Sequence, residues 1–392
     1  MSDTAATAPL LPASSNWQEF ASRYSVTTLI VIGIVVVPVL NVLGVIPIET
    51  VNMLGRYMCF AIVAIGLDLL WGYTGILSLC QAFFFSLGGY AMGMYLAHHG
   101  GPEGIIDKTG MKIPACLYVV YPYKVGEAPE DALVPWFWKP FYDLHWAILL
   151  GMLIPGVVAA LIGYVGFRSR VKGVYFAILT QAITVAAWLV FCMNNMKLCG
   201  TNGLTRFDKI LGHPLSEDYV KLALYIATAA ALAGAFFLCR YIVNSRLGRI
   251  LVAVRDDENT LRFSGYQPSL YKMFAFTVAA MLAGLGGVLY APQMGIFTPS
   301  NMEASASILV VIWVAVGGRG TLSGAVLGAL VINLLYNYLT SERDFLLFTW
   351  KSDYWPIVLG LLFIGVVLVF PNGLIHIWHK LTGQADPQER NS

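Results

Sequence analysis

The chain has 392 residues, of which 58% are hydrophobic and only 12% are charged, and its mean hydropathy is +0.70. A soluble domain could not keep so much apolar surface out of water, so the composition excludes an ordinary soluble protein and predicts an integral membrane protein. The net charge of +2 argues against nucleic acid or an acidic macromolecule as the partner.

Long apolar segments predict the fold class. A helix needs roughly 20 apolar residues to cross a bilayer, and about ten segments qualify. A β-barrel is disfavoured because its strands alternate in hydropathy over about ten residues, whereas these runs are continuous. We therefore predict an all-α protein, a polytopic transmembrane helical bundle of about 10 spans. The predicted spans are residues 27–45, 51–71, 80–97, 146–167, 173–193, 219–238, 273–290, 306–316, 321–339 and 354–370.

Basic residues indicate the orientation of these spans, because short cytoplasmic loops collect lysine and arginine. Arg168, Arg170 and Lys172 form one such loop, and six basic residues between 240 and 272 form another. Two predicted spans separate the loops, so both can face the cytoplasm, and both termini then lie there as well. Residues 1–25 lack an apolar core preceded by basic residues, which argues against a cleaved signal peptide.

This topology divides the chain into predicted regions. A transmembrane domain is flanked by two cytoplasmic segments and interrupted by an external insertion. The insertion is rich in aromatic residues, which indicates an interfacial belt or, alternatively, a surface for an external partner. The regions are a cytoplasmic N-terminal segment over 1–26, a transmembrane domain over 27–370 that includes the external insertion over 100–145 and a cytoplasmic loop over 240–272, and a cytoplasmic tail over 371–392.

The cytoplasmic loop is unusual because it packs six cations and three adjacent acids into a mostly hydrophobic chain. Asp256 and Asp257 are candidate N-caps of a helix. Gly265 is a natural stop, and Pro268 prevents continuation. A short helix is therefore predicted over 257–264. Between two spans it suits a docking element for a partner protein, and the alternative is a positive-inside loop with an ordinary surface helix.

A weak internal repeat is visible in two glycine-rich stretches that share the pattern GxxGxLS. One covers residues 72–78 and the other residues 317–323, and each interrupts an apolar run. Transporters often carry repeated halves whose discontinuous helices expose backbone groups to the solute, so the repeat supports transport; chance similarity between glycine-rich turns is the alternative. Asp68 is the clearest ionisable group within a span. We expect it to be solvated near the interface or to cap the break at Gly72.

Uncharged polar residues within the spans are candidates for contact with a solute. Thr180, Gln181 and Thr184 share a helical face. Such groups suit a neutral or zwitterionic solute rather than a metal ion, and the alternative is ordinary interhelical hydrogen bonding. The polar residues are Ser78, Gln81, Ser86, Thr180, Gln181, Thr184 and Asn333, of which Ser78, Gln81, Thr180, Gln181 and Thr184 are the predicted substrate pathway.

Motifs for catalysis, metal binding and ATP hydrolysis are missing from the sequence. The six histidines stand apart from any nucleophile or ligand cluster, and His376 and His379 lie in the polar tail. No GxxxxGK[ST] loop occurs, so an ATP-driven motor must be another subunit. The six cysteines form no CxxC motif. Cys116 and Cys199 both fall in predicted external loops, where they either pair or serve as small apolar residues.

A series of further motifs occurs in one order along the chain. They are residues 72–75 followed by Ser78 and Leu79, then residues 88–90, 170–179, 201–204, 292–295, 316–322 and 371–374. In the cytoplasmic loop, Gly248 and Arg249 precede residues 253–258, and residues 265–268 follow. In this order the motifs resemble the permease family of ABC importers for branched-chain amino acids and urea, specifically the larger of the two permease subunits.

The resemblance implies a type II-like ABC importer permease, a transport subunit rather than an enzyme, located as a multi-pass protein in the bacterial inner membrane. It implies that the short helix couples the chain to a motor. The implied partners are a second homologous permease subunit, two ATP-binding cassette subunits, a periplasmic substrate-binding protein and the lipid bilayer. ATP and Mg would be bound by those partner subunits, with no cofactor in this chain. The implied ATPase-coupling residues are Arg255, Asp256, Asp257, Glu258, Arg262 and Gly265.

Two segments resemble the urea branch of that family. They are residues 88–95 and 134–141. Many relatives carry Gly-His where this chain has Cys80 and Gln81, and an uncharged Gln81 is compatible with urea. We therefore predict half of an ATP-driven translocation pathway for urea. The alternatives are the same machine for branched-chain amino acids, an ATP-independent channel or carrier for a small neutral solute, and a structural membrane scaffold.

Overall fold

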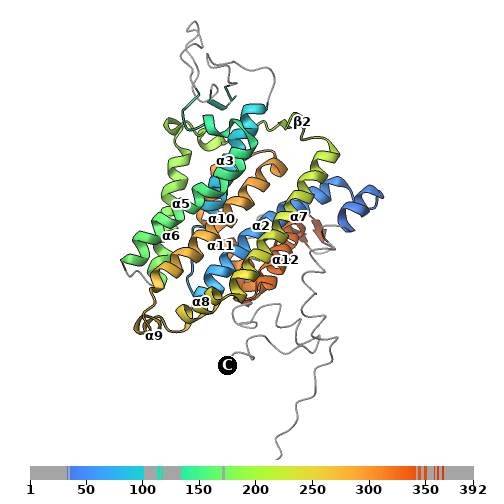
Figure 1. Cartoon of the computed structure of the whole chain (residues 1–392). Coiled ribbons are helices and arrows are strands. Elements are labelled where there is room, and N and C mark those ends of the chain that lie inside the picture. The colour runs from blue at the N-terminus through green and yellow to red at the C-terminus, as the bar shows by residue number, and fades with distance from the viewer. Residues whose placement is uncertain are drawn as a thin grey trace, which may run out of the picture.

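The computed structural model describes residues 33, 36–100, 113–114, 116–117, 134–169, 173–340, 343–345, 348–350, 357, 360–361 and 364–365. The described helices form an elongated bundle (Figure 1). We call one end the α9 end, which carries residues 246–263, and the other the loop end, which carries residues 194–217.

The elements follow the apolar runs of the sequence. The helices are α2 Ile48–Thr74, α3 Gln81–His99, α5 Leu144–Arg168, α6 Val174–Cys192, α7 Asp218–Asn244, α8 Arg246–Asp256, α9 Glu258–Phe263, α10 Pro268–Met294, α11 Ala304–Gly317 and α12 Leu322–Thr340. Short 3-10 turns are η2 Lys139–Tyr142, η3 Asn194–Met196, η4 Gly200–Asn202 and η5 Pro299–Met302. Two antiparallel hairpins depart from the all-α prediction, β1 Lys209–Ile210 with β2 His213–Pro214 and β3 Arg343–Phe345 with β4 Phe348–Trp350.

Six of the described helices are long and apolar enough to cross a membrane, namely α2, α5, α6, α7, α10 and α12. They confirm the predicted helical bundle. The predicted span over 306–316 forms α11, whose 14 residues measure about 21 Å at 1.5 Å per residue. Because the hydrocarbon core is about 30 Å thick, α11 is too short to cross it alone. The predicted span over 80–97 forms α3, which has 19 residues but is not one of the six.

Several predicted features lie outside the described residues. They are the segments 1–26 and 371–392, most of the last span, Arg170, Lys172, His376 and His379. The predicted first span is described only in part, and its residues 36–42 are helical.

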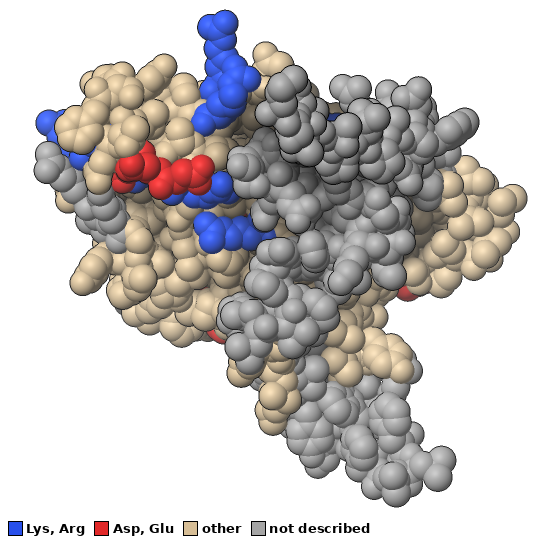
Figure 2. Space-filling model, turned by 90° about the horizontal axis from the view of Figure 1, so that it is seen from below, with Lys and Arg blue, Asp and Glu red and all other residues tan. Residues whose placement is uncertain are grey.

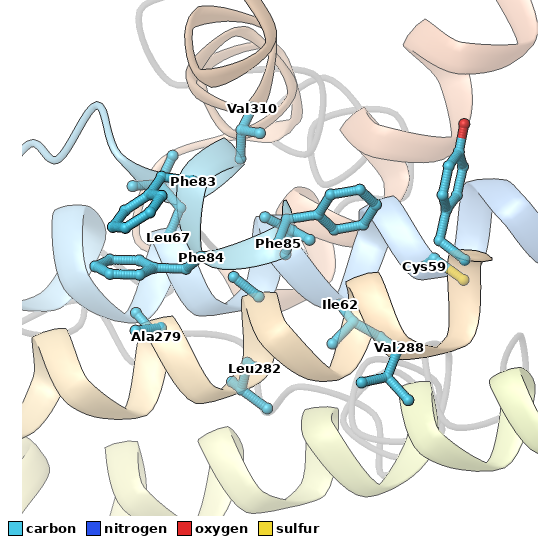
Figure 3. Close-up of a cluster of buried hydrophobic side chains, with 14 of the residues drawn as sticks. Cys59, Ile62, Leu67, Phe83, Phe84, Phe85, Ala279, Leu282, Val288 and Val310 are labelled. Carbon is cyan, nitrogen blue, oxygen red and sulfur yellow. The ribbon is translucent and has the colours of Figure 1, made fainter. Parts of the chain in front are cut away.

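Helix α10 packs against α2, α3 and α5, and glycines allow this close approach. A Cβ added to Gly88 on α3 would meet the carbonyl of Gly284 on α10, and one added to Gly284 would meet the carbonyl of Gly151 on α5. Small residues at such contacts are typical of membrane helices. Buried aromatic side chains fill the space beside them, among them Phe84 and Phe85 (Figure 3).

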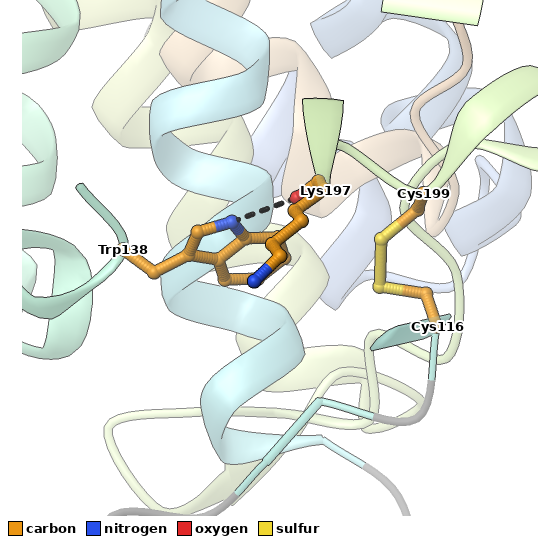
Figure 4. Close-up of a disulfide and its surroundings, with 4 residues drawn as sticks. All are labelled: Cys116, Trp138, Lys197 and Cys199. Carbon is orange, nitrogen blue, oxygen red and sulfur yellow. Dashed lines mark hydrogen bonds between the residues drawn. A yellow bond between two sulfur atoms is a disulfide. The ribbon is translucent and has the colours of Figure 1, made fainter. Parts of the chain in front are cut away.

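A disulfide between Cys116 and Cys199 holds the loop end together (Figure 4). The sequence left open whether these two cysteines pair, and the structure pairs them. Nearby, Trp138 is fully buried, and its Nε1 donates a hydrogen bond to the carbonyl of Lys197 at 3.0 Å (Figure 4). Segments far apart in the sequence are therefore fixed to one another at this end.

Candidate functional site

The predicted short helix is confirmed and forms one side of the candidate site. It is α9, Glu258–Phe263, one residue shorter at each end than predicted. The Asp257 carboxylate caps it by accepting hydrogen bonds from the backbone N–H groups of Asn259 at 2.9 Å and Thr260 at 3.3 Å. Gly265 follows with φ +85°, a left-handed conformation that favours glycine after a helix.

The charged residues around α9, between Arg255 and Lys272, pair largely with one another. Seen from below, basic and acidic side chains gather on one side of the described surface (Figure 2). Glu258 bridges two cations, since Arg262 Nη2 lies 2.6 Å from its Oε1 and Lys272 Nζ lies 2.8 Å from its Oε2. The Glu258 and Lys272 side chains are only 14% and 12% exposed, so the bridge fixes α9 against the first turns of α10. Much of the charge that the sequence assigns to docking thus stabilises the chain itself.

The two ends of α9 differ in chemistry. At its start, hydrogen bonds from the Thr260 hydroxyl and from the backbone N–H groups of Thr260 and Asn259 lower the pKa of the Asp257 carboxyl, because each bond favours the charged form. At its end, Phe263 is 93% exposed. An exposed aromatic side chain on a rigid helix is a typical anchor for a protein partner.

Arg255, at the end of α8, connects this segment to the end of α2. Its Nη1 donates to the carbonyl of Gly72 at 3.0 Å. Carbonyls in the last turn of a helix lack intrahelical partners and are stabilised by cations. A Cβ on Gly75, the left-handed C-cap of α2 with φ +76°, would lie 2.9 Å from Cγ of Arg255. The arginine therefore lies directly against the first glycine-rich stretch.

The second glycine-rich stretch packs against the same end of α2. Arg319 donates from Nε and Nη2 to the carbonyl of Trp71 at 3.2 and 3.0 Å, and its guanidinium lies 4.9 Å from the centre of the Trp71 ring. Asp68 is fully buried and accepts a hydrogen bond from the N–H of Gly320 at 2.7 Å, while its Oδ2 has no partner among the described residues. The two GxxGxLS stretches therefore meet at α2.

The prediction for Asp68 is wrong. The side chain is not solvated, and it binds the second glycine-rich stretch instead of capping the break at Gly72. Arg319 was missed as a site residue. Its signal in the sequence is a lone cation between two apolar runs, where a charge without a partner would be costly.

Residues 75–80 form no regular structure between α2 and α3, and α6 bonds to the backbone of Leu79 in this segment. The N–H of Leu79 donates to Thr180 Oγ1 at 3.0 Å, and Thr184 Oγ1 donates to the carbonyl of Leu79 at 3.1 Å. Irregular backbone within a membrane needs such partners in the protein. Thr180 and Thr184 thus bond α6 to the segment between α2 and α3. This structural role is close to the interhelical hydrogen bonding that the sequence offered as the alternative, and contact of the two threonines with a solute stays a prediction.

The other predicted pathway residues differ in their hydrogen bonding. Ser78 Oγ lies 3.2 Å from Cys80 Sγ. Gln81, the first residue of α3, is fully buried, and neither atom of its amide has a partner among the described residues. Oε1 of Gln181 is likewise buried without a partner there. Because buried polar groups are normally hydrogen-bonded, these two amides remain candidates for contact with water or a solute.

Comparison with known proteins decides the family. A family model described as "Branched-chain amino acid transport system / permease component" matches residues 49–367. The chain belongs to this permease family. The matched residues include both glycine-rich stretches, α8 and α9. The protein is therefore a permease component of an ABC-type transporter, with several helices in the membrane.

Similar proteins agree with this assignment. The high-affinity branched-chain amino acid transport system permease protein LivM of Escherichia coli (strain K12) is 23% identical over 342 residues, which cover 81% of this chain and 68% of LivM. The autoinducer 2 import system permease protein LsrC of Enterobacter sp. (strain 638) is 27% identical over 234 residues, which cover 58% of this chain and 64% of LsrC. No solved structure matches the chain significantly.

Proposed function

We propose that this permease lines half of the translocation pathway of an ATP-driven importer and that α9 receives the motion of the motor. The observation that carries the proposal is the hydrogen bond from Arg255 to the Gly72 carbonyl. Arg255 lies in the last turn of α8, two residues before Asp257, the cap of α9. A displacement of α9 therefore acts directly on the end of α2 and on the break at residues 75–80.

The proposed partners follow from the family. Two ATP-binding subunits would bind ATP and Mg and contact α9, a second homologous permease would complete the pathway, and a periplasmic binding protein would deliver the solute. Phe263 and the basic residues of α8 and α9 suit a protein surface better than lipid, because cations are costly within a bilayer. ATP-driven closure of the motors would shift the spans from outward to inward access.

The proposed orientation places the α9 end in the cytoplasm of a bacterial cell and the loop end in the periplasm. Basic residues collect at the α9 end, as expected for a cytoplasmic loop. The disulfide between Cys116 and Cys199 lies at the loop end, and disulfides persist in oxidising compartments such as the periplasm. The two observations support the same orientation independently.

Branched-chain amino acids are the solute that the comparisons support best. The matching family model and LivM are both named for them.

Urea is the second candidate, and a separate observation favours it. Residues 88–95 and 134–141 resemble the urea branch of the family. The second segment includes Trp138, which is buried and hydrogen-bonded at the loop end, so this part of the segment packs into the folded structure.

Uptake by whole cells tests both candidates. Labelled leucine and labelled urea are supplied separately to cells with the chain, without it, and with the deletion complemented. The proposal expects uptake of one of the two solutes to disappear with the chain and to return on complementation, and to depend on cellular ATP. Uptake of both solutes that is unchanged by the deletion would contradict both candidates, and uptake by the purified chain without ATP would indicate a channel.

A further inference from the structure

A cavity of about 480 Å³ lies between α2, α10, α11 and α12. Its walls are mainly apolar and aromatic, for example Phe60, Leu309 and Trp313. One cation and several amides interrupt this apolar lining. A cavity of several hundred Å³ with few polar groups in an apolar wall is the usual form of a small-molecule site. None of the five predicted pathway residues lines it.

Arg56 is the cation in this cavity, and no charged group among the described residues pairs with it. Among the described residues, the hydrogen bond recorded for its side chain runs from Nη1 to the sulfur of Met294 at 3.2 Å, and its Nε is buried without an acceptor. A thioether is only a weak acceptor. Cations inside membrane spans are rare and usually mark the route of a solute or ion. The guanidinium is therefore left with donors for a ligand.

Asparagines that line the same cavity supply hydrogen-bond acceptors, which the guanidinium of Arg56 lacks. Asn333 Nδ2 donates to the carbonyl of Ala329 at 2.7 Å, which leaves the amide oxygen as the acceptor of that side chain. Asn301 and Asn337 also line the cavity. The site thus combines a planar donor group with amide oxygens that accept hydrogen bonds.

We propose that this cavity is a solute-binding site, in which Arg56 donates to a carbonyl or carboxylate oxygen of the solute and Asn333 accepts from its N–H groups. Leucine and urea share this chemistry, since each carries an oxygen acceptor together with N–H donors. The inference rests on the proposed import function and adds the residues that hold the solute.

The apolar wall distinguishes the two solutes. Leu309 and Ile332 line the cavity beside the polar groups and offer contact to an aliphatic side chain, which leucine has and urea lacks. Truncation of Leu309 to alanine should raise the KM for leucine severalfold if leucine is the solute. The same change should leave the KM for urea within about twofold if urea is the solute.

The first test compares Arg56→Gln and Arg56→Lys with the matched control Arg206→Gln, an exposed arginine at the loop end. Each full-length variant is produced with its partner subunits, its amount in the membrane is measured, and uptake of labelled leucine and of urea is followed. We expect Arg56→Gln to raise the KM for the transported solute about tenfold or more, because it removes charge-assisted hydrogen bonds. Arg56→Lys should fall between it and the wild type, and the control should be unchanged. A wild-type KM in Arg56→Gln would overturn the site and leave the import function standing.

A second measurement does not depend on the variants folding. The wild-type importer is treated with phenylglyoxal, which modifies accessible arginines, and the peptides containing Arg56 and Arg206 are quantified by mass spectrometry. We expect saturating leucine or urea, whichever is transported, to protect Arg56 and not Arg206. Equal modification of Arg56 with and without solute would overturn the proposal. No modification of Arg56 in the absence of solute would show that its guanidinium is not accessible from the cavity, which would overturn the proposal as well.

Discussion

The α9 end and the cavity differ in how their polar groups are satisfied. At the α9 end, Asp257, Glu258 and Arg255 are each bonded to named partners at 2.6 to 3.3 Å. In the cavity, Nε of Arg56 is buried without an acceptor among the described residues. At the start of α3, the amide nitrogen and oxygen of Gln81 are also buried without hydrogen-bond partners there. A buried polar group without a partner destabilises a protein by about 1–3 kcal/mol. The difference teaches that paired polar groups fix α9 and its cap, whereas unpaired polar groups mark where we expect a solute to bind.

The largest effect is expected at Asp68. Asp68→Ala leaves the N–H of Gly320 without its acceptor and should lower the stability of the purified chain by roughly 2–3 kcal/mol. Asp68→Asn keeps an oxygen acceptor at the same place, so its loss of stability should be smaller than that of Asp68→Ala. Heat-induced unfolding in detergent, followed by tryptophan fluorescence, measures both. Identical midpoints for Asp68→Ala and the wild type would show that the contact between Asp68 on α2 and the second glycine-rich stretch does not stabilise the fold.

A smaller effect is expected at Glu258. Glu258→Gln removes the charge that holds Arg262 and Lys272 and should cost about 1–2 kcal/mol locally, discounted for partial exposure. Backbone amides of α9 should then exchange hydrogen for deuterium faster. The matched control is Asp218→Asn, whose carboxylate is 77% exposed and lies 3.8 Å from Lys221. Unchanged exchange in α9 would mean that its position does not depend on the bridge.

Two neutral polar residues sharpen the comparison. Thr184→Val removes the donor to the Leu79 carbonyl and should lower the free energy of unfolding by about 1 kcal/mol. Thr184→Ser keeps the hydroxyl and should restore that stability.

Gln81→Leu removes an amide that has no partner among the described residues. The stability of the chain should therefore stay the same or rise, while solute uptake falls. The same unfolding assay and the uptake assay, run side by side, check both. A strong loss of stability in Gln81→Leu would show that its amide is bonded within the protein.

The smallest effect is a dependence of the α9 cap on pH. Because the folded pKa of Asp257 is lowered, its capping contribution is complete above the unfolded pKa of about 3.9 and is lost as the pH falls through the lowered folded value. Protection of the Asn259 and Thr260 amides from exchange, corrected for intrinsic rates, should fall in that window. In Asp257→Asn the dependence on pH should vanish. Protection that stays constant through the same window in the wild type would contradict the cap.

Local signals were enough to predict the short helix α9. Asp257 at the cap, Gly265 as the stop and the apolar runs on either side all act within a few residues, and the structure agrees with each. The two GxxGxLS stretches were also visible in the sequence, but their contacts at the end of α2 were not.

The contacts that build the site could not be predicted because they join distant parts of the chain. Arg255 bonds to a residue 183 positions away, Asp68 to one 252 positions away, and Thr184 to one 105 positions away. Nothing in the local pattern around these residues specifies such partners. Arg56 was overlooked for a related reason, since a single cation near the end of an apolar run looks like an interfacial residue until the helices around it are placed.

The central claim is that Arg255 couples the motor to the break in the permease, and reconstitution tests it most directly. The complete importer with wild-type chain or with Arg255→Gln is placed in liposomes, and ATP hydrolysis and solute uptake are measured in the same preparation. We predict that Arg255→Gln assembles and hydrolyses ATP while its uptake per ATP falls at least about tenfold, because the link from α9 to the Gly72 carbonyl is lost. Uptake per ATP equal to that of the wild type would contradict the account.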